Sequence, residues 1–189
     1  MKPGAREETP AEDKKDEAPA APRFTDVAPA SPFAKAIDWA VAEGITTGKT
    51  ETTFGPSDTC TVSHILTFLW RANGKPGAAE GVADRDAAAK WAVEQKLIGE
   101  GQDVSAPCTR VMAVGFLWGV AGKPESKAEL SFTDVDKEAD YAGAIAWAVE
   151  NKVTAGTSET TFSPENTCTR GQIVTFLYRA ANAAAEASK

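Results

Sequence analysis

The 189-residue sequence contains a single histidine, His64, and only three cysteines. A single histidine leaves both a Ser-His-Asp triad and a histidine-based metal site poorly supplied, so neither is expected. The sequence has no run of 18 apolar residues, which disfavours a transmembrane helix. Basic residues number 20 against 27 acidic ones, a net charge of −7, whereas nucleic-acid binding relies on clustered basic residues. These absences predict a soluble, acidic protein with no metal, cofactor, nucleic-acid partner or membrane insertion.

Residues 1–23 differ in composition from the rest of the chain. They include 11 charged residues, four prolines and five alanines, and apart from Met1 they lack a large apolar side chain. Such a segment buries too little surface to offset its ordering entropy, so we expect a disordered linker. A cloning or leader remnant is the alternative. A linker here would suggest a cargo domain upstream, and a secretion signal would have been removed or would also lie upstream.

The remainder of the chain is repetitive. Residues 24–73 align without a gap on residues 132–181, and 26 of the 50 positions are identical. The offset between them is 108 residues, which leaves room for a middle copy of about half that length. Trp91 and Cys108 belong to this middle copy, because they correspond to a tryptophan and a cysteine of the outer copies. The middle copy is shorter, and it lacks the Phe-Thr-Asp-Val opening and the Phe-x-Pro turn. The predicted organisation is a linker, three copies and a C-terminal tail: 1–23, 24–76, 77–124, 125–182 and 183–189.

Each copy is expected to form a helix, a loop and a second helix, because apolar residues recur at helical spacing. The first-helix stripe of copy one is Phe33, Ala36, Ile37, Ala40 and Val41, and the second-helix stripes are Ile65, Leu66 and Leu69 in copy one and Ile173, Val174 and Leu177 in copy three. One helix pair cannot bury its apolar face alone, whereas three packed pairs can. The predicted fold is therefore all-α, a compact body of three helix-loop-helix units with pseudo-threefold character.

The expected helix ends follow from capping residues. Gly44 and Asn151 are placed for left-handed C-terminal caps. The second helices are expected to begin after the N-cap residues Thr61, Thr109 and Thr169. Gln172, three residues after the last of these, predicts a capping box.

Cys60, Cys108 and Cys168 share one position, directly before the predicted N-cap threonine. We favour small buried side chains that pack at each helix entry. A cysteine-only metal site near a threefold axis is the alternative, although no Cys-x-x-Cys spacing supports it. His64 lies in the first turn of its helix and is predicted to be a surface or capping residue rather than a catalytic one.

Trp39, Trp91 and Trp147 are equivalent residues of the three first helices. Two roles remain open for them at this point. They could pack between helices, which we favour, or present a platform on which a sugar ring stacks.

Arg110 and Arg170 directly follow N-cap threonines, where a cation opposes the helix macrodipole. An anionic ligand would explain the placement, since the free N–H groups of a helix start also attract anions. The guanidinium fork suits a carboxylate or a phosphate. Pairing with a nearby acid such as Asp134 is the alternative. Copy one has Val62 at this position and so lacks whatever the arginine does.

Taken together, these residues resemble the S-layer homology (SLH) repeat over about residues 24–182. The shared pattern is Phe-x-Asp-Val, Trp, Gly, Phe-x-Pro and then Thr-Arg at a helix start. The Thr-Arg-Ala-Glu motif of that family corresponds to Thr169-Arg170-Gly171-Gln172, to Thr109-Arg110-Val111-Met112 and, without the arginine, to Thr61-Val62-Ser63-His64. Three tandem copies are also the usual number in the family.

The resemblance implies a module that anchors proteins non-covalently to the bacterial cell wall, mostly in Gram-positive bacteria. Such modules bind secondary cell wall polysaccharides, often through pyruvylated N-acetylmannosamine, in grooves between repeats where the motif arginine contacts the ligand. A secreted protein at the cell surface is implied. The candidate ligand-binding residues are Arg170, Arg110, Thr169, Thr109, Asp134, Asp26, Trp147, Trp39, Gly156 and Gly48. For the two glycines a simple turn requirement explains their presence at least as well.

Two further hypotheses compete with the anchor. A protein-interaction or self-assembly module that kept the fold and lost sugar binding is supported by Val62 and by the shortened copy two, each of which puts one groove in doubt. An enzyme is the third hypothesis, but the sequence offers no nucleophile–base pair or metal-ligand cluster, so no catalytic activity is expected. The groove that uses Arg170 is the strongest candidate for a binding site.

Overall fold

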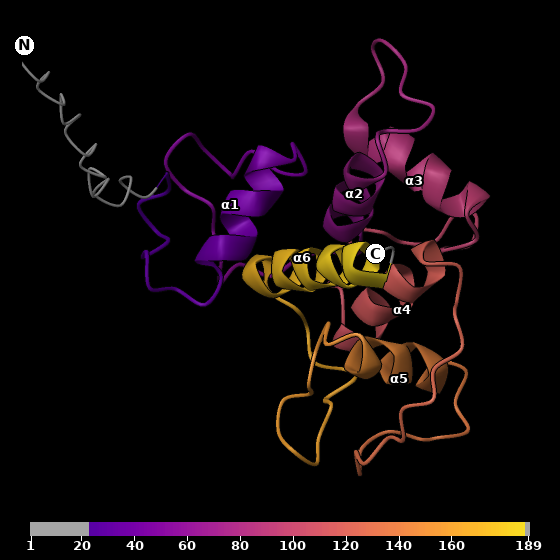
Figure 1. The fold of residues 1–189 in the computed structure, drawn as a ribbon. Helices are drawn as coiled ribbons and strands as arrows, with labels where there is room; N and C mark the ends of the chain where they lie inside the picture. The colour runs from indigo at the N-terminus through magenta and orange to yellow at the C-terminus, as the bar shows by residue number, and fades with distance from the viewer. Residues whose placement is uncertain (1–22, 188–189) are drawn as a thin grey trace, which may run out of the picture.

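The computed structural model describes residues 23–187, and this part of the chain folds into six helices without a strand (Figure 1). The helices are α1 (Ala34–Ala42), α2 (Val62–Ala72), α3 (Asp84–Glu94), α4 (Arg110–Val120), α5 (Ala142–Glu150) and α6 (Arg170–Ala187). The prediction of an all-α fold is confirmed. Residues 1–22, and with them most of the predicted linker, lie outside the described residues.

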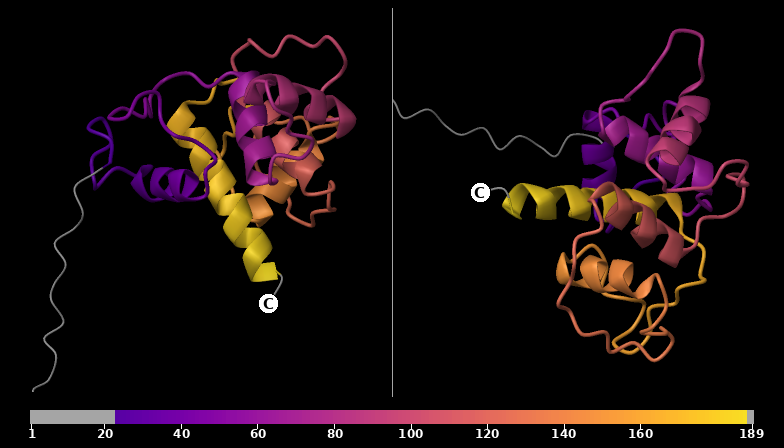
Figure 2. Two further views of the ribbon diagram at one scale, coloured as in Figure 1. Left: turned by 90° about the horizontal axis from the view of Figure 1, so that it is seen from above. Right: turned by 90° about the vertical axis from the view of Figure 1, so that its right-hand side faces the viewer.

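The helices pair between copies rather than within them. α3 packs on α2, α5 packs on α4 and α1 packs on α6, so each first helix lies against the second helix of the preceding copy. The contact between α1 and α6 joins copy one to copy three and closes the ring. Figures 1 and 2 show α6, the longest helix, running between α1 and α4. Each copy therefore depends on its neighbours to cover its apolar helix faces.

The three copies meet at the cysteines. The N–H of Cys60 donates to the carbonyl oxygen of Cys168 (2.9 Å), that of Cys108 to Cys60 (2.8 Å) and that of Cys168 to Cys108 (2.8 Å). These three hydrogen bonds close a ring around the pseudo-threefold axis. All three cysteines are free and fully buried, so the prediction of buried side chains at the helix entries is confirmed.

The buried thiols also bear on the metal alternative. Burial raises the pKa of Cys60 to about 12 and that of Cys168 to about 11, so both stay protonated at neutral pH, whereas metal ligation needs the thiolate. Within residues 23–187, the structure brings no three metal-binding side chains together. The cysteines thus serve packing in the part of the chain that the structure describes.

The predicted caps form. The N–H groups of His64, Met112 and Gln172 donate to the side chains of the preceding N-cap threonines (3.3, 3.4 and 3.3 Å). Gln172 Oε1 accepts the N–H of Thr169 (2.9 Å), which completes the predicted capping box. His64 does the same for Thr61 through Nδ1 (3.2 Å), so its predicted capping role is confirmed.

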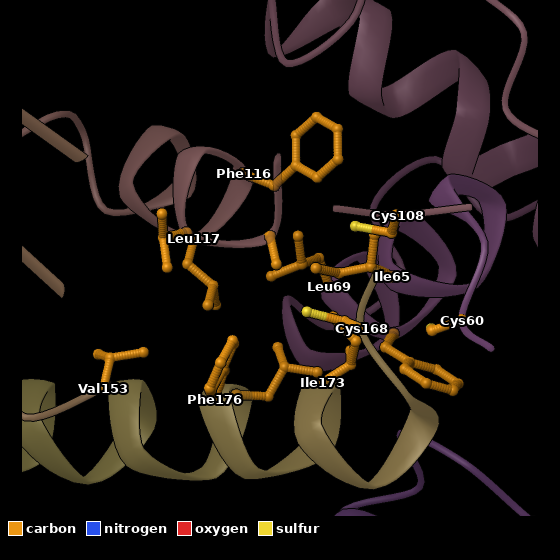
Figure 3. Close-up of a cluster of buried hydrophobic side chains, with 14 of the residues drawn as sticks. Cys60, Ile65, Leu69, Cys108, Phe116, Leu117, Val153, Cys168, Ile173 and Phe176 are labelled. Carbon is orange, nitrogen blue, oxygen red and sulfur yellow. The ribbon is translucent and has the colours of Figure 1, made fainter. Parts of the chain in front are cut away.

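Most of the predicted apolar stripes are buried, and those of the second helices form the centre of the core. The fully buried members are Ala36, Ile37, Ala40, Ile65, Leu66, Leu69, Ile173, Val174 and Leu177. Figure 3 shows side chains of α2, α4 and α6 gathering near the cysteines, with Phe116, Leu117 and Phe176 among them. The 3-4 spacing of these residues is what brings them to one face of each helix.

Two helix ends differ from the sequence prediction. Gly44 is left-handed as predicted (φ +67°), but Asn151 is not (φ −86°), and the left-handed residue is Lys152 (φ +56°). Asn151 instead caps the helix through its side chain, since Nδ2 donates to the carbonyl oxygen of Trp147 (2.9 Å). The C-terminal cap of α5 is therefore one residue later than the sequence analysis placed it.

The helix α6 extends to Ala187, into the segment that was expected to be a tail. After α2 and α4 a Gly-Lys-Pro spacer ends the helix, and the indole N–H of Trp70 or Trp118 donates to the proline carbonyl of that spacer (2.9 Å in both). Copy three has no such spacer, and its alanine-rich sequence favours continuation of the helix.

Candidate functional site

A groove of about 610 Å³ surrounds the start of α6. The loop after α1 and the helix α2 provide one part of its wall, the start of α3 another, and Arg170 of α6 a third. All three copies of the repeat thus contribute to this groove. We call it the Arg170 groove.

Arg170 is the first residue of α6 and only 6 % exposed. Its Nε donates to the carbonyl oxygen of Phe54 (3.1 Å), and its guanidinium lies over the rings of Phe54 (4.8 Å) and Phe68 (5.5 Å). Arg170 lines the groove, and its two terminal nitrogens make no hydrogen bond within residues 23–187. Burial lowers the pKa of this guanidinium, but arginine remains charged at neutral pH. The groove therefore contains a buried cation with free donors.

The backbone of α6 does not add to these donors, which corrects the expectation from the sequence. The N–H of Arg170 donates to the carbonyl oxygen of Asp58 (2.9 Å), and that of Gly171 to Pro56 (2.9 Å). The loop of copy one crosses the helix start and satisfies the N–H groups that were expected to be free. An anion in this groove would meet the guanidinium rather than the helix end.

Arg110, the equivalent residue of copy two, is bound more completely. Its Nε donates to the carbonyl oxygen of Phe162 (2.8 Å) and its Nη2 to Thr154 Oγ1 (3.1 Å). Asp134, the alternative partner, makes no direct ion pair with Arg110 among residues 23–187, although its charge acts on Arg110 and favours the charged guanidinium. Thr46, the counterpart of Thr154, makes no such bond to Arg170.

Asp26 and Asp134 hold loops rather than line the Arg170 groove. The carboxylate of Asp26 accepts the N–H groups of Phe54 (2.8 Å) and Gly55 (2.7 Å), and Asp134 makes the equivalent pair of bonds in copy three, to Phe162 (2.9 Å) and Ser163 (2.7 Å). The Phe-Thr-Asp-Val opening and the Phe-x-Pro turn are thus two halves of one clamp. This explains why copy two lacks both of them together.

We expect Asp134→Asn to lower the free energy of unfolding at pH 7 and to make that free energy fall less steeply as the pH is lowered. The N–H of Phe162, above all, lowers the pKa of Asp134 below its ordinary value. A carboxyl with a lowered pKa stabilises the fold above its unfolded-state pKa, and this contribution is lost as the pH falls through the folded-state pKa. Urea unfolding between about pH 5 and pH 1 measures the difference. Parallel curves for the variant and the wild type would refute this role.

Gly48 and Gly156 both adopt left-handed backbone angles (φ +91° and +89°). A Cβ on Gly48 would lie 2.6 Å from the ring of Phe24, and one on Gly156 would lie 2.7 Å from the ring of Phe132. The turn alone therefore accounts for both glycines. Gly48 additionally lines the Arg170 groove, so it alone of the two contributes to that site.

The candidate tryptophans lie elsewhere. Trp39 packs edge-on against Tyr178 (5.5 Å between ring centres), and Trp147 is buried. Both line a separate hollow of about 1210 Å³, formed with the C-terminal ends of α2, α4 and α6. The structure places neither near Arg170, which favours the packing role over the sugar platform at that groove.

Val62 faces the shortened loop of copy two. Its N–H donates to the carbonyl oxygen of Ala106 (3.0 Å), as Arg170 donates to Asp58 in the neighbouring interface. In that loop Gln102 stands where the other copies have Phe54 and Phe162, counting back from the cysteine. The lost arginine and the lost phenylalanine, which appeared as defects of two grooves in the sequence, therefore belong to a single groove.

The polar residues of the Arg170 groove that were not chosen from the sequence include His64, Arg71 and Arg85. Burial, followed by the charge of Arg170, lowers the pKa of His64, so its ring is neutral at pH 7. Since its Nδ1 accepts the cap hydrogen bond, its Nε2 carries the hydrogen and can donate. Arg71 Nε donates to Asp84 (2.8 Å). The sequence did offer a signal that could have identified Arg71, because copy three has an arginine, Arg179, at the equivalent position.

The comparison with protein families is consistent with this geometry. The family model for the S-layer homology domain matches residues 23–61 and 131–174. These two segments, in copies one and three, are similar to the S-layer homology domain, and they contain Gly48, Asp26, Asp134 and Arg170. That domain is known as a non-catalytic binding module for cell-wall anchoring. No curated protein matches the chain.

Between residues 23 and 187, none of the helices has both the length and the apolar character that crossing a membrane requires.

Proposed function

We propose that this chain anchors a protein to the bacterial cell wall by binding a secondary cell wall polysaccharide, with an anionic, pyruvylated sugar in the Arg170 groove. The observation that supports this most is the state of Arg170. The residue is buried, yet its two terminal nitrogens make no hydrogen bond in the described part of the chain. A carboxylate fits that planar pair of donors in the bidentate geometry that arginine favours.

The energetics favour an anion at this point. Arg170 makes no direct ion pair among residues 23–187, although the charges of Asp58 and Asp26 act on it from a distance. Its burial is costly, and the rings of Phe54 and Phe68 offset only part of that cost. A ligand carboxylate would complete the pairing. A hydrogen bond to a charged group contributes about 1.5–3 kcal/mol, enough to decide between a pyruvylated sugar and its neutral parent.

The other groove residues suit a sugar. His64 Nε2 offers a neutral donor, and Ser63, Thr67 and Ser105 also line the groove. The hydroxyl groups of Thr67 and Ser105 already donate within the protein, to the carbonyl oxygen of Ser63 and to Asp103, so towards a ligand they act as acceptors. Hydroxyl groups both donate and accept, as the hydroxyl groups of a sugar do. Grooves that are weak individually can add by avidity along a repetitive polymer when more than one of them is engaged.

Several parts of this proposal extend beyond the Arg170 groove. Copy two is proposed to be a degenerate third repeat, with the boundaries given above. The protein is proposed to act outside the cell, at the wall of a Gram-positive bacterium. Residues 1–23 would link the anchor to an upstream cargo domain.

Calorimetric titration of the chain with purified wall polysaccharide tests the proposal. We expect the native polymer to bind and the polymer stripped of pyruvate to bind at least about tenfold more weakly, from the strength of a charge-assisted hydrogen bond. Equal binding of both polymers would show that the carboxylate is not recognised.

Binding to neither polymer would instead favour the second candidate, a protein-interaction or self-assembly module. The observation behind that candidate is the groove of Val62 and Gln102, which has lost both its arginine and its phenylalanine.

A further inference from the structure

Arg85 occupies a position that is aromatic in the other two copies. It stands six residues before Trp91, as Phe33 stands before Trp39 and Tyr141 before Trp147. In copy one this aromatic side chain packs on the neighbouring helix start, where a Cβ on Gly171 would lie 2.8 Å from the ring of Phe33. Arg85 is exposed instead and lines the Arg170 groove. Copy two has thus exchanged an aromatic packing residue for a cation at the mouth of this groove.

The ionisable side chains of the groove carry an excess of positive charge. They are Arg71, Arg85 and Arg170 against one acid, Asp84, with His64 neutral. Asp84 is already paired, since it lies 2.8 Å from Arg71 and 3.8 Å from Lys75. Arg85 and Arg170 therefore have no anion of their own among the groove-lining residues, and the acids that act on them, Asp86 on Arg85 and Asp58 and Asp26 on Arg170, lie outside that lining.

Arg85 is only weakly engaged by the protein itself. Its Nε lies 3.4 Å from Asp86 Oδ1, and the two side chains are 75 % and 65 % exposed. An ion pair of this length and exposure contributes little, so a ligand can take over the guanidinium at small cost. Arg170 has free terminal nitrogens, as described above. Both cations of the groove are thus available at once.

We infer that the Arg170 groove takes a doubly anionic ligand, with one carboxylate at Arg170 and a second anionic group, a carboxylate or a phosphate, at Arg85. This inference rests on the proposed function. Arg85 then determines specificity, because a sugar with one negative group would use Arg170 alone. Arg85 also distinguishes the Arg170 groove from the groove of Arg110, in which the residue equivalent to Arg85 is Phe33.

The test uses the full chain, two variants and two probes. The variants are Arg85→Phe, which restores the aromatic residue type of copy one, and Arg85→Lys, which keeps the charge. The probes are the methyl glycoside of pyruvylated N-acetylmannosamine, with one anionic group, and the same glycoside phosphorylated on the one hydroxyl group that the pyruvate ketal leaves free. We expect Arg85→Phe to weaken binding of the phosphorylated probe by about tenfold or more and of the simple glycoside by less than about twofold, from the strength of one charge-assisted hydrogen bond. Arg85→Lys should retain most of the difference in affinity between the phosphorylated and the simple glycoside.

The outcomes separate the two proposals. If the glycosides bind in an Arg170-dependent manner but Arg85→Phe weakens both equally or neither, the doubly anionic ligand is refuted while the anchor function stands. If the wild type binds neither probe nor the native polymer, both proposals fail. Thermal unfolding of each variant shows whether the fold is intact, and since Arg85 is exposed, a shift in Tm of more than a few degrees would itself contradict its placement at the groove mouth.

Discussion

Arg170→Met is expected to weaken binding of the native wall polysaccharide by about tenfold to a hundredfold, the range for loss of a charge-assisted hydrogen bond. Methionine keeps an apolar stem between Phe54 and Phe68 and removes only the charge and its donors. The affinity of Arg170→Lys should lie between those of the wild type and Arg170→Met, because an ammonium keeps the charge without the planar fork of donors. Calorimetry with the native polymer gives the affinities.

The chain offers a matched control at Arg110. Its Nη2 already donates to Thr154 Oγ1 and its Nε to Phe162, so it has less left for a ligand. We expect Arg110→Met to leave the affinity within about twofold while costing similar stability, because both arginines are equally buried at equivalent helix starts. Equal losses of affinity in the two variants would mean that the Arg170 groove is not the principal site.

An isolated third copy, residues 125–189, is expected not to fold. In the intact chain α5 packs on α4 and α6 packs on α1, and neither partner is present in this piece. Cys168 would also lose both neighbours of the cysteine ring. The isolated copy should lose its cooperative fold altogether, and not only a few kcal/mol of stability, because the helix pairs form only between copies.

Far-UV circular dichroism and amide hydrogen exchange test this on the piece and on the full chain. The piece should show residual helix at most, contributed by the alanine-rich α6, no protected amides and no cooperative melting. The full chain should show a cooperative transition. A piece that melts cooperatively would contradict helix pairing between the copies.

Features encoded over short stretches could be predicted from the sequence. The helical spacing of Ile65 and Leu69, the N-cap threonines and the capping box of Gln172 each depend on residues within one or two turns, and the structure has all of them. The burial of the cysteines followed from their place before the caps. The repeat of 108 residues, and the half-period within it, indicated the number of units.

Features that join distant segments could not be predicted in this way. The closure of the ring by α1 and α6 is set by how three helix pairs share apolar faces, which spacing within a copy does not reveal. The backbone partners of Arg170 and Gly171 come from Asp58 and Pro56, over a hundred residues earlier in the chain. Without them, the helix start was expected to offer free N–H groups, and that expectation was wrong.

The candidate site was predicted only in part. Arg170 and Gly48 meet in one groove, whereas Asp26 and Asp134 clamp loops and Trp39 and Trp147 pack elsewhere. These residues share one repeat pattern, but the repeat uses some of them for folding and others at the groove, and a pattern cannot separate the two. Arg85 could be recognised only once the groove had been located, because its meaning lies in what the other copies have at its position.

Following the polysaccharide titration through the backbone amide signals of the chain tests most directly whether the Arg170 groove is the binding site. We expect shifts at Thr46, Thr47, Gly48 and His64, with little change at the equivalent Thr154 and Gly156. Shifts at Thr154 and Gly156 with none at Gly48 would place the ligand at Arg110. Shifts confined to Trp39 and Trp147 would place it in the hollow at the helix ends, and either result would refute binding in the Arg170 groove.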